Sequence, residues 1–519
     1  MQNLPIGIQT FSEIIEKDYL YIDKTESIYN LLKKGKYFFL SRPRRFGKSL
    51  LVSTLKEIFK GNKELFKGLY IYDKIDGNEK YPVINLSMSN LKGTNELSSI
   101  YESAYLMLET NAIEYGIKLK KYDNPAITFS VLISELAKNN KVVVLIDEYD
   151  KPIVDHLTHN EISKRNRNFL RDFYSVLKDK DQHIKFCLLT GVSKFSKVSV
   201  FSGLNNLYDI TLDRNFSTIC GITQDELNKY FDDRLPAIAN EYGITIEELK
   251  LKIKEWYNGY SWDGVNKLYN PFSILNFFNS YKFDNFWFSS GTPSFLIEKY
   301  KESKTIIEDI KEFKTASTFF DQSEIDIIDF RPLLFQTGYL TVKEYDFINN
   351  IYTLGYPNKE VKDAFLSYIA ATFVEKSPGD LGYLNTYLRL SLMSNDLSRF
   401  FKYLKSIFSS IPYQLHIANE AYYHSLFYLI MELTGIEMDL EVSTNKGRID
   451  GVIEFEKVIY IIEFKYLADN KNVEELLNTA ITQIKTKEYF APYLKKGKSI
   501  KYLAIAINKE TVEYKFEEN

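Results

Sequence analysis

Two carboxylates and an ammonium group stand close together near the C-terminal end of the chain. They belong to Asp450, Glu463 and Lys465 in the stretch GRIDGVIEFEKVIYIIEFKY, where two apolar runs joined by a short turn predict a pair of strands. Side chains alternate between the faces of a strand, so Glu463 and Lys465 share a face on which Asp450 can meet them. Carboxylate oxygens bind hard cations such as Mg²⁺, which activates water, and a lysine stabilises charge developing on a phosphate. The pattern predicts a metal-dependent site for a phosphodiester.

The bare pattern Glu-x-Lys has a simpler interpretation, which is an edge hairpin carrying an exposed ion pair. Three further features favour the metal site. The strand around Glu463 is strongly apolar, Asp450 precedes it by one hairpin, and a stretch of helical pattern lies on each side. An ion-paired hairpin remains the alternative to a catalytic centre.

A second candidate site lies at residues 37–50, YFFLSRPRRFGKSL. A short apolar strand runs into a polar turn that ends in Gly47-Lys48-Ser49, and an amphipathic helix follows, which is the order of a phosphate-binding loop. Amides at a helix N-terminus favour anionic phosphate, Lys48 would reach the β- and γ-phosphates, and Ser49 would bind Mg²⁺. Arg42 stands where the generic pattern has its first glycine, so an ordinary basic turn before a helix is the alternative.

Two acids follow the apolar run KVVVLIDEYD, residues 141–150. A continuous apolar run is typical of a strand buried on both faces of a parallel sheet, and ligands bind at the carboxyl ends of such strands. Asp147 suits the role of holding Mg²⁺, directly or through water, and Glu148 that of polarising the attacking water. A third apolar run, residues 184–191, ends near Thr190 and Ser193, which could sense the γ-phosphate.

Several stretches, in this order, resemble a bacterial AAA-ATPase-like family that often carries a C-terminal PD-(D/E)XK nuclease. The similar stretches are LPIGIQTFSEIIEKDYLYIDKTESIYNLL at the start, RPRRFGKS, ICGITQDEL (219–227), WYNGYSW (256–262), YNPFSIL (269–275) and the C-terminal acids with their lysine. RPRRFGKS is the usual form of the loop in that family, so Arg42 is consistent with a working site. The resemblance spans nearly the whole chain.

The resemblance implies ATP and Mg²⁺ as cofactors, with Mn²⁺ as an alternative ion at the nuclease site, and nucleic acid, DNA favoured over RNA, as partner. Asp450 would be the metal-binding acid and Glu463 and Lys465 the E-x-K pair, with Glu420 on the preceding helix and Gln483 on the following helix as weaker candidates. The residues implied at the nucleotide site are Arg42, Pro43, Arg44, Arg45, Phe46, Gly47, Lys48, Ser49, Asp147, Glu148 and Thr190.

Many such ATPases use an arginine finger to stabilise the charge of the transition state. The candidates are Arg42, Arg44 and Arg45 in the loop itself, Arg165, Arg167 and Arg171 in one predicted helix, and Arg214 after the third apolar run. Each could act within the chain or across an interface of a homo-oligomer. The alternative for each is a solvated helix face.

The composition limits the partners and the compartment. Lys and Arg number 66 against 69 Asp and Glu, so any contact with nucleic acid must use a local basic patch. The two cysteines, Cys187 and Cys220, lie among apolar residues, which favours buried thiols over a bridge and excludes a cysteine zinc site. No signal sequence or membrane-spanning run is evident, so we expect a cytoplasmic protein without a membrane partner.

The 519 residues predict several domains, because a domain commonly has roughly 100–200 residues. The expected fold class is α/β. Two short stretches, residues 338–342 and 351–354, predict a β-hairpin after a helix, as in a winged-helix module. For this module a spacer or regulatory role is favoured over DNA binding. The expected parts are an AAA-like P-loop ATPase domain (1–218), a helical lid (219–300), a winged-helix-like connector (301–375), a helical linker (376–415) and a PD-(D/E)XK nuclease-like domain (416–519).

The leading hypothesis from these observations is an ATP-regulated, Mg²⁺-dependent nuclease. The alternative is a signalling NTPase switch, in which the C-terminal domain is an effector or a non-catalytic nucleic-acid-binding module.

Overall fold

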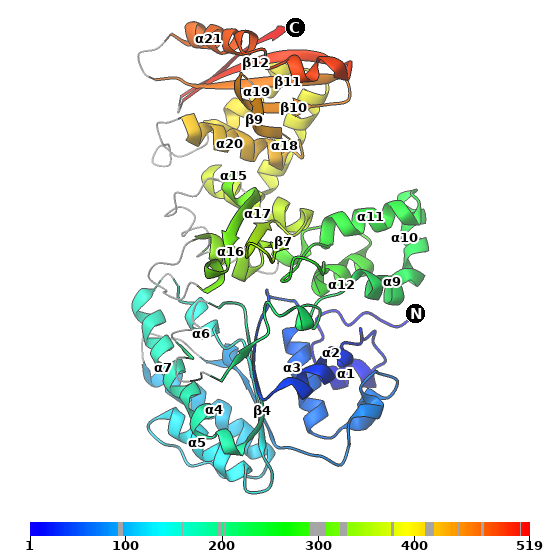
Figure 1. Cartoon of the computed structure of the whole chain (residues 1–519), viewed down its shortest axis with the longest axis vertical. Helices are drawn as coiled ribbons and strands as arrows, with labels where there is room; N and C mark the ends of the chain where they lie inside the picture. The colour runs from blue at the N-terminus through cyan, green and yellow to red at the C-terminus, as the bar shows by residue number, and fades with distance from the viewer. Residues whose placement is uncertain are drawn as a thin grey trace. The chain divides into compact units, whose positions relative to one another are not determined.

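The computed structural model covers one chain that divides into two compact units. The first unit is Met1–Thr305 with Asp309–Lys362, and the second is Ile306–Glu308 with Asp363–Asn519. Figure 1 shows the chain coloured from its N-terminus to its C-terminus. The structure describes all residues except 92–96, 158, 195–199, 202–203, 205, 290–295, 297–307, 322–329, 375–377, 410–419, 437, 445, 469–471 and 509. The expected boundaries near residues 300, 375 and 415 lie outside the described residues.

The first unit is built on a five-stranded parallel sheet, which confirms the α/β fold class. Its strands follow the spatial order β2-β3-β4-β1-β5, and β1 and β3 are buried along their whole length. The strands are β1 (Tyr37–Ser41), β2 (Val83–Ser87), β3 (Val142–Asp147), β4 (Ile184–Gly191) and β5 (Tyr208–Asp209). The two apolar runs before Asp147 and Thr190 are therefore neighbouring strands, β3 and β4, which bring these residues to one edge of the sheet.

Helices cover both faces of this sheet, and Figure 1 shows one group on either side of it. One group is α1 (Phe11–Glu16), α2 (Thr25–Lys34) and α3 (Lys48–Phe59). The other is α4 (Leu97–Glu114), α5 (Pro125–Leu136), α6 (Lys151–Val154) and α7 (Asn160–Asp179). Helix α3 begins directly at the expected phosphate loop, so the strand–loop–helix order is confirmed.

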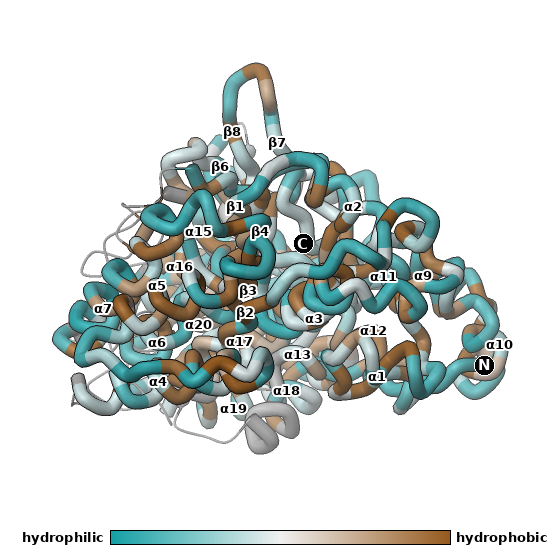
Figure 2. Tube along the Cα trace, turned by 90° about the horizontal axis from the view of Figure 1, so that it is seen from below, coloured by the Kyte–Doolittle hydropathy of each residue, from teal (hydrophilic) through white to brown (hydrophobic). Residues whose placement is uncertain are grey.

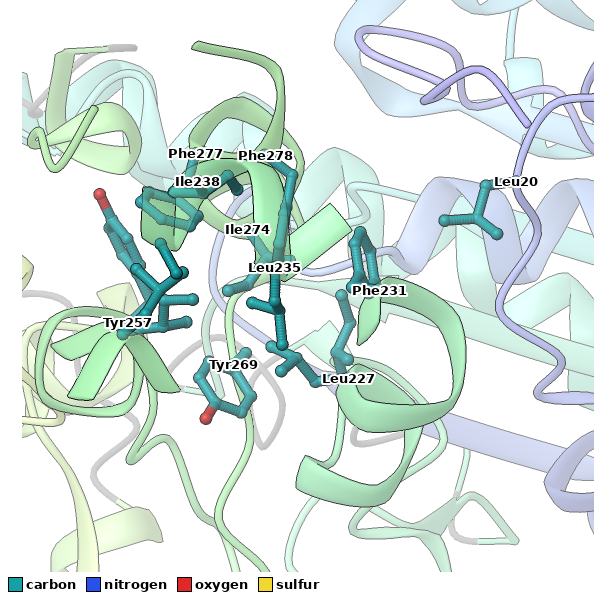
Figure 3. Packing of buried hydrophobic residues seen from close by; sticks show 14 residues of the cluster. Leu20, Leu227, Phe231, Leu235, Ile238, Tyr257, Tyr269, Ile274, Phe277 and Phe278 are labelled. Atoms are coloured by element: carbon teal, nitrogen blue, oxygen red, sulfur yellow. The ribbon is translucent and has the colours of Figure 1, made fainter. Parts of the chain in front are cut away.

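A small helical cluster follows the sheet in sequence. Thr223 caps α9 in a capping box with Glu226, and Thr245 caps α11 with Glu248 in the same way. The helices bury a shared apolar core that includes Phe231, Leu235 and Phe277 (Figure 3). They are α9 (Gln224–Phe231), α10 (Leu235–Tyr242), α11 (Ile246–Tyr257) and α12 (Pro271–Ser280), followed by the short α13 (Phe286–Ser289).

The hairpin expected after residue 338 is present as β7 (Thr341–Asp346) paired antiparallel with β8 (Ile351–Gly355). A third strand that the sequence did not predict, β6 (Glu312–Ala316), pairs with the other edge of β8. Two short helices accompany this sheet, α15 (Glu308–Lys311) and α16 (Phe330–Thr337). Figure 2 shows the β7–β8 hairpin extending outward with an apolar tip, where Phe347 and Ile348 are each 78% exposed.

The second unit contains a mixed five-stranded sheet of order β13-β12-β11-β10-β9, in which only β11 and β12 are parallel neighbours. Helix α21 packs against β11 and β12, and α20 packs against β11 and β9. The strands are β9 (Met438–Thr444), β10 (Gly447–Glu454), β11 (Val458–Tyr466), β12 (Ser499–Ile507) and β13 (Val512–Glu518). The helices of this part are α17 (Lys359–Val374), which begins in the first unit, α18 (Pro378–Met393), α19 (Leu397–Phe408), α20 (Glu420–Leu433) and α21 (Val473–Thr486).

Among the described residues, no helix is both long enough and apolar enough to cross a lipid bilayer.

Candidate nucleotide and metal sites

The expected phosphate loop folds tightly between β1 and α3. Two of its residues have left-handed backbone conformations, Arg45 at φ +61° and Gly47 at φ +93°. Glycine adopts such a φ without strain, which explains the Gly47 directly before the helix. The first amides of α3 have no partner within the helix, and they can therefore bind an anion.

Lys48 lies inside this loop with only 6% of its side chain exposed. Its Nζ donates hydrogen bonds to the carbonyl oxygens of Arg42 and Pro43, both at 2.8 Å. Burial lowers the pKa of Lys48, while the carboxylates of Asp147, Asp150 and Glu148 oppose that shift. The ammonium group thus occupies the loop itself, and a phosphate would have to draw it away from the two carbonyls.

Asp147 joins the loop to the two central strands. Its Oδ2 accepts a hydrogen bond from Ser49 Oγ at 2.5 Å, and its Oδ1 accepts one from Thr190 Oγ1 at 2.5 Å. The structure therefore brings together the three side chains that were expected at the Mg²⁺ and γ-phosphate end of the site. A hydroxyl and a carboxylate in this arrangement provide the oxygen ligands that Mg²⁺ takes in phosphate sites.

Ser193 does not join this group. It bonds instead to Asp150, whose Oδ2 accepts from Ser193 N at 2.7 Å and from Ser193 Oγ at 2.5 Å. Burial raises the pKa of Asp150, and these hydrogen bonds oppose that shift. Asp150 ties the end of β3 to the end of β4, a role that sequence reasoning missed although the residue lies in the DEYD stretch.

Glu148 follows Asp147 in a left-handed backbone conformation, with φ +54°. Such a conformation is strained for a residue with a side chain and is common at functional positions. Burial raises the pKa of Glu148, opposed mainly by the nearby Lys151. A half-buried carboxylate with a raised pKa suits a group that takes a proton from water.

The side chain of Arg42 makes its contacts within the protein interior. It is fully buried, its guanidinium donates to the carbonyl oxygens of Ser41 and Thr211 at 2.9 Å, and it lies 3.9 Å from the centre of the Trp262 ring. More distant bonds reach the carbonyls of residues 216 and 217. Its side chain therefore holds the start of the loop in place and is not among the residues that line the cavity over the loop, and its expected part in nucleotide binding stays a prediction. Trp262 of WYNGYSW is a core residue, only 5% exposed.

A cavity of about 660 Å³ opens over the loop, within the first unit. Its polar wall includes Lys48, Ser49, Glu148 and Lys151. Its apolar wall comes from the N-terminal segment, residues 219–222 and the start of α12, and includes Ile8, Leu20, Tyr21, Ile22, Ile222 and Leu275. The volume and the mixed lining suit a ligand with an apolar ring at one end and phosphates at the other.

The predicted loop residues divide between two positions. Arg44, Arg45, Phe46, Gly47, Lys48 and Ser49 line the cavity together with Glu148. Arg42, Pro43, Asp147 and Thr190 are not among the residues that line it. Of the arginines considered as fingers, Arg44 and Arg45 line the cavity, and Arg42, Arg165, Arg167, Arg171 and Arg214 are not among its lining residues.

In the second unit, the three predicted nuclease residues meet. Lys465 Nζ lies 2.9 Å from Glu463 Oε1, and Asp450 Oδ2 accepts a hydrogen bond from the backbone N–H of Phe464 at 2.8 Å. Glu463 is only 1% exposed, and its Oε2 is buried without a hydrogen-bond partner among the described residues. A buried carboxylate oxygen without a partner is costly, which points to a ligand at this position.

The electrostatics of this group are those of crowded acids. Burial raises the pKa of Glu463 to about 7, with a further contribution from the charge of Asp450. Burial also raises the pKa of Asp450, opposed by the Phe464 N–H bond and Lys465. Burial disfavours the charged form of Lys465, but the hydrogen bond and charge of Glu463 outweigh it and raise its pKa.

Helix α20 contributes two residues to this site. Glu420 Oε2 accepts a hydrogen bond from the backbone N–H of Tyr466 at 3.1 Å. One turn further along the helix, His424 Nε2 donates to the carbonyl oxygen of Asp450 at 3.1 Å, and its ring lies edge-on to Phe464. Sequence reasoning missed His424, although its position four residues after Glu420 places both on one helix face.

Gln483 is a residue of α21, the helix that packs against β11 and β12. It lines a shallow hollow of about 620 Å³ along one face of α21, with Thr479 and Thr482. Among the described residues, no hydrogen bond joins Gln483 to Asp450, Glu463 or Lys465.

The donor set at Asp450 and Glu463 is compatible with Mg²⁺. The described part of the chain holds no group of three or more His, Cys, Asp or Glu side chains arranged around one metal position. Mg²⁺ is commonly held by one or two carboxylates together with waters and substrate phosphates. The unpartnered Glu463 Oε2 beside Asp450 fits such an ion, and substrate would complete its shell.

Comparison with known proteins matches both units. Residues 5–201 match the family described as Predicted AAA-ATPase, and residues 418–517 match the PD-(D/E)XK nuclease superfamily. A protein of Azotobacter chroococcum mcd 1, named "Uncharacterized protein in vnfD 5'region", is 37% identical over 524 residues, covering 98% of this chain and 97% of its own length.

The chain belongs to the family in which an AAA-ATPase-like domain is joined to a PD-(D/E)XK nuclease-like domain. This membership confirms the resemblance drawn from the motifs.

Proposed function

We propose that the protein binds and hydrolyses ATP and that its C-terminal domain is a Mg²⁺-dependent nuclease, with DNA favoured over RNA as substrate. We further propose that the ATPase controls cleavage. The observation that carries the nuclease proposal is Glu463, a nearly fully buried acid with one unpartnered oxygen beside Asp450 and Lys465. An apolar strand gains nothing in stability from such a residue, so a catalytic role explains it best.

At the nucleotide site, each of the chain's own residues has a defined task. The amides after Gly47 would bind phosphate oxygens, and Lys48 would exchange the carbonyls of Arg42 and Pro43 for phosphate oxygens. Ser49 and Asp147, already joined by a hydrogen bond, would hold Mg²⁺. Bound Mg²⁺ would neutralise phosphate charge. Glu148 would take a proton from the attacking water.

At the nuclease site, Asp450 and Glu463 would hold the ion, and His424 would keep the Asp450 backbone in place. Mg²⁺ bound there would activate water and polarise the phosphodiester. The ammonium group of Lys465, now bonded to Glu463, would also stabilise the negative charge that develops on the phosphate. Its role is therefore in the transition state more than in substrate binding.

The test combines purified full-length protein with linear or circular DNA, Mg²⁺, and ATP or no nucleotide. We expect Mg²⁺-dependent cleavage whose rate changes with ATP. Cleavage that persists after chelation of Mg²⁺ would contradict the metal mechanism. ATP hydrolysis without cleavage of DNA or RNA would favour the alternative, an NTPase switch with a non-catalytic C-terminal module.

Coupling between the domains is tested with Glu148→Gln. This substitution keeps the shape of the side chain but removes the charge that polarises water, so ATP should bind and persist. The variant should therefore hold the nuclease in one state, fully active or fully inactive, whenever ATP is present. Equal cleavage rates with and without ATP, in both wild type and variant, would show that the domains are tethered but not coupled.

A further inference from the structure

The buried carboxylate of Glu360 connects two segments that touch the phosphate loop. Glu360 is the second residue of α17 and has no solvent exposure. Its two oxygens accept hydrogen bonds from Ser273 Oγ at 3.0 and 2.8 Å, and Oε1 also accepts from the backbone N–H of Trp287 at 2.8 Å. One side chain thus joins the start of α17 to α12 and to α13.

Trp287 extends this connection to the phosphate loop. Its indole Nε1–H donates to the carbonyl oxygen of Arg44 at 3.1 Å, and its ring packs edge-on against Tyr339 at 5.1 Å. Gly338 lies against the same loop, because a Cβ at that position would stand 2.6 Å from Pro43 Cβ and 3.3 Å from Trp287 Cζ2. The loop backbone at residues 43–44 is therefore held between Gly338 and the indole.

The second connection runs through α12. Phe272, next to Ser273, lies under the Arg45 guanidinium with 3.9 Å between the guanidinium carbon and the ring centre. Both Phe272 and Arg45 line the nucleotide cavity. Glu360 therefore bonds to Ser273, the neighbour of Phe272, which contacts Arg45. It also bonds to Trp287, which itself donates to the carbonyl oxygen of Arg44.

The surroundings of Glu360 raise the pKa of its carboxyl group. Burial raises the pKa of Glu360 to about 7, the bonds from Trp287 and Ser273 oppose this shift, and the charge of Asp284 adds to it. Tyr257 and Tyr260 face it from the end of α11 and the turn beyond. The turn that follows α11 fits closely against the segment before α17, since a Cβ at Gly259 would stand 2.0 Å from the Pro357 carbonyl oxygen.

Helix α17 continues beyond this joint. It begins at Lys359 in the first unit, and its residues from Asp363 onward belong to the second. Phosphate binding would draw Lys48 from the carbonyls of Arg42 and Pro43, next to the carbonyl that Trp287 holds. A change in the loop would therefore reach Trp287 first and Glu360 next.

We propose that Glu360 is a positioning residue through which occupancy of the phosphate loop is coupled to α17, the helix that leads into the second unit. The proposal rests on the nucleotide binding proposed above and adds the series of contacts through which that binding affects α17. Coupling of this kind is reciprocal, so a change at Glu360 that alters α17 also alters nucleotide affinity.

The test measures amide hydrogen exchange in residues 359–366 of the full-length protein, with and without Mg²⁺ and a non-hydrolysable ATP analogue. Wild type is compared with Trp287→Phe, which removes the indole N–H but keeps the backbone bond to Glu360, and with Glu360→Gln. Glu344→Gln, an exposed change on β7, is the control for loss of charge. Equilibrium dialysis measures binding of the analogue to each variant.

In wild type and Glu344→Gln, the analogue should change exchange in this segment by about fivefold or more, a range typical of coupling between sites. Trp287→Phe and Glu360→Gln should still bind the analogue and lose that response. A response equal to wild type in both variants, or no response in a wild type that binds the analogue, would overturn the coupling route. Failure of wild type to bind the analogue would overturn nucleotide binding itself, and the route with it.

Discussion

The two candidate sites differ in whether their buried charged groups have hydrogen-bond partners. At the phosphate loop, Lys48 bonds to two carbonyls of its own loop, and Asp147 bonds to the hydroxyls of Ser49 and Thr190. In the second unit, Glu463 has one oxygen on Lys465 and the other without a partner among the described residues. Lys48 and Asp147 at the first site thus have partners within the protein, whereas Glu463 Oε2 at the second site has none among the described residues.

This difference indicates how each site meets its ligand. The loop must exchange existing hydrogen bonds for phosphate oxygens, so binding there is coupled to a change in the loop. The crowded acids of the second unit already have raised pKa values, and a cation relieves both their repulsion and the unpartnered oxygen. We therefore expect ligand-driven rearrangement at the first site and ligand-driven stabilisation at the second.

The largest effect is expected for Lys48→Ala, which removes the cation from the centre of the loop. ATP hydrolysis should fall by at least about a hundredfold, because both phosphate binding and charge stabilisation are lost. The assay is steady-state phosphate release together with binding of labelled ATP. Lys60→Ala, at the end of the same helix and in an ion pair with Glu114, is the matched control and should hydrolyse ATP normally. Wild-type turnover in Lys48→Ala would refute the phosphate-loop assignment.

A nearly equal loss is expected at the other site for Asp450→Asn. The amide keeps the volume and can still accept the Phe464 N–H bond, but it removes one anionic ligand. DNA cleavage should fall by about a hundredfold or more, while the free energy of unfolding stays unchanged or rises slightly because Glu463 loses a like-charged neighbour. Asp439→Asn, an exposed change on the adjacent strand β9, should affect neither quantity. An ion-paired hairpin without catalysis would predict unchanged cleavage.

A smaller effect is expected in the stabilisation that a bound metal ion gives, and it should depend on the second site and not on the first. At about a hundred times the dissociation constant, Mg²⁺ or Mn²⁺ should stabilise the second unit by about 3 kcal/mol in wild type. Asp450→Asn should lose most of this gain, and Lys48→Ala should keep it. The measurement is the unfolding of the second unit by hydrogen exchange in β10 and β11, with ion or chelator. Equal stabilisation of wild type and Asp450→Asn would place the ion elsewhere.

Local patterns were enough to predict much of both sites. The apolar runs before Asp147 and Thr190 predicted buried parallel strands, and the period-two pattern placed Glu463 beside Lys465. Both follow from short-range geometry, in which a strand end or a strand face determines where a side chain lies. The β7–β8 hairpin belongs to the same category, since it depends on only a few consecutive residues.

Contacts between distant segments were not predictable in this way. Arg42 was expected at the nucleotide, but the carbonyl of Thr211 and the ring of Trp262 take up its guanidinium. The sequence around Glu360 resembles that around any exposed glutamate on a helix. Only the packing of α12 and α13 against α17 buries this residue. No local pattern records that packing, so the residue passed unnoticed among the acids of the chain.

The smallest effect is expected from the ionisation of Glu360, and it sharpens the contrast with the second site. The pKa of this carboxyl is raised from 4.5 to about 7 in the folded protein, so folding favours its protonated form. Its stabilising contribution is complete below pH 4.5 and is lost as the pH rises through about 7. Between pH 6 and 8, wild type should lose about 1 kcal/mol of unfolding free energy that Glu360→Gln keeps.

Tryptophan fluorescence during urea unfolding measures this difference in the first unit alone, because Trp256, Trp262 and Trp287 all belong to it. Glu344→Gln, the exposed change on β7, is the control for loss of a charge and should follow the wild-type curve. Parallel pH curves for wild type and Glu360→Gln would mean that Glu360 is ionised at the same pH in the folded and unfolded chains. If the unfolding free energies of wild type and Glu360→Gln diverge only in this pH range, the Glu360 carboxyl between the phosphate loop and α17 is protonated in the folded protein. Loss of that proton then lowers the free energy of unfolding. At Glu463, by contrast, a bound cation would take the place of that proton.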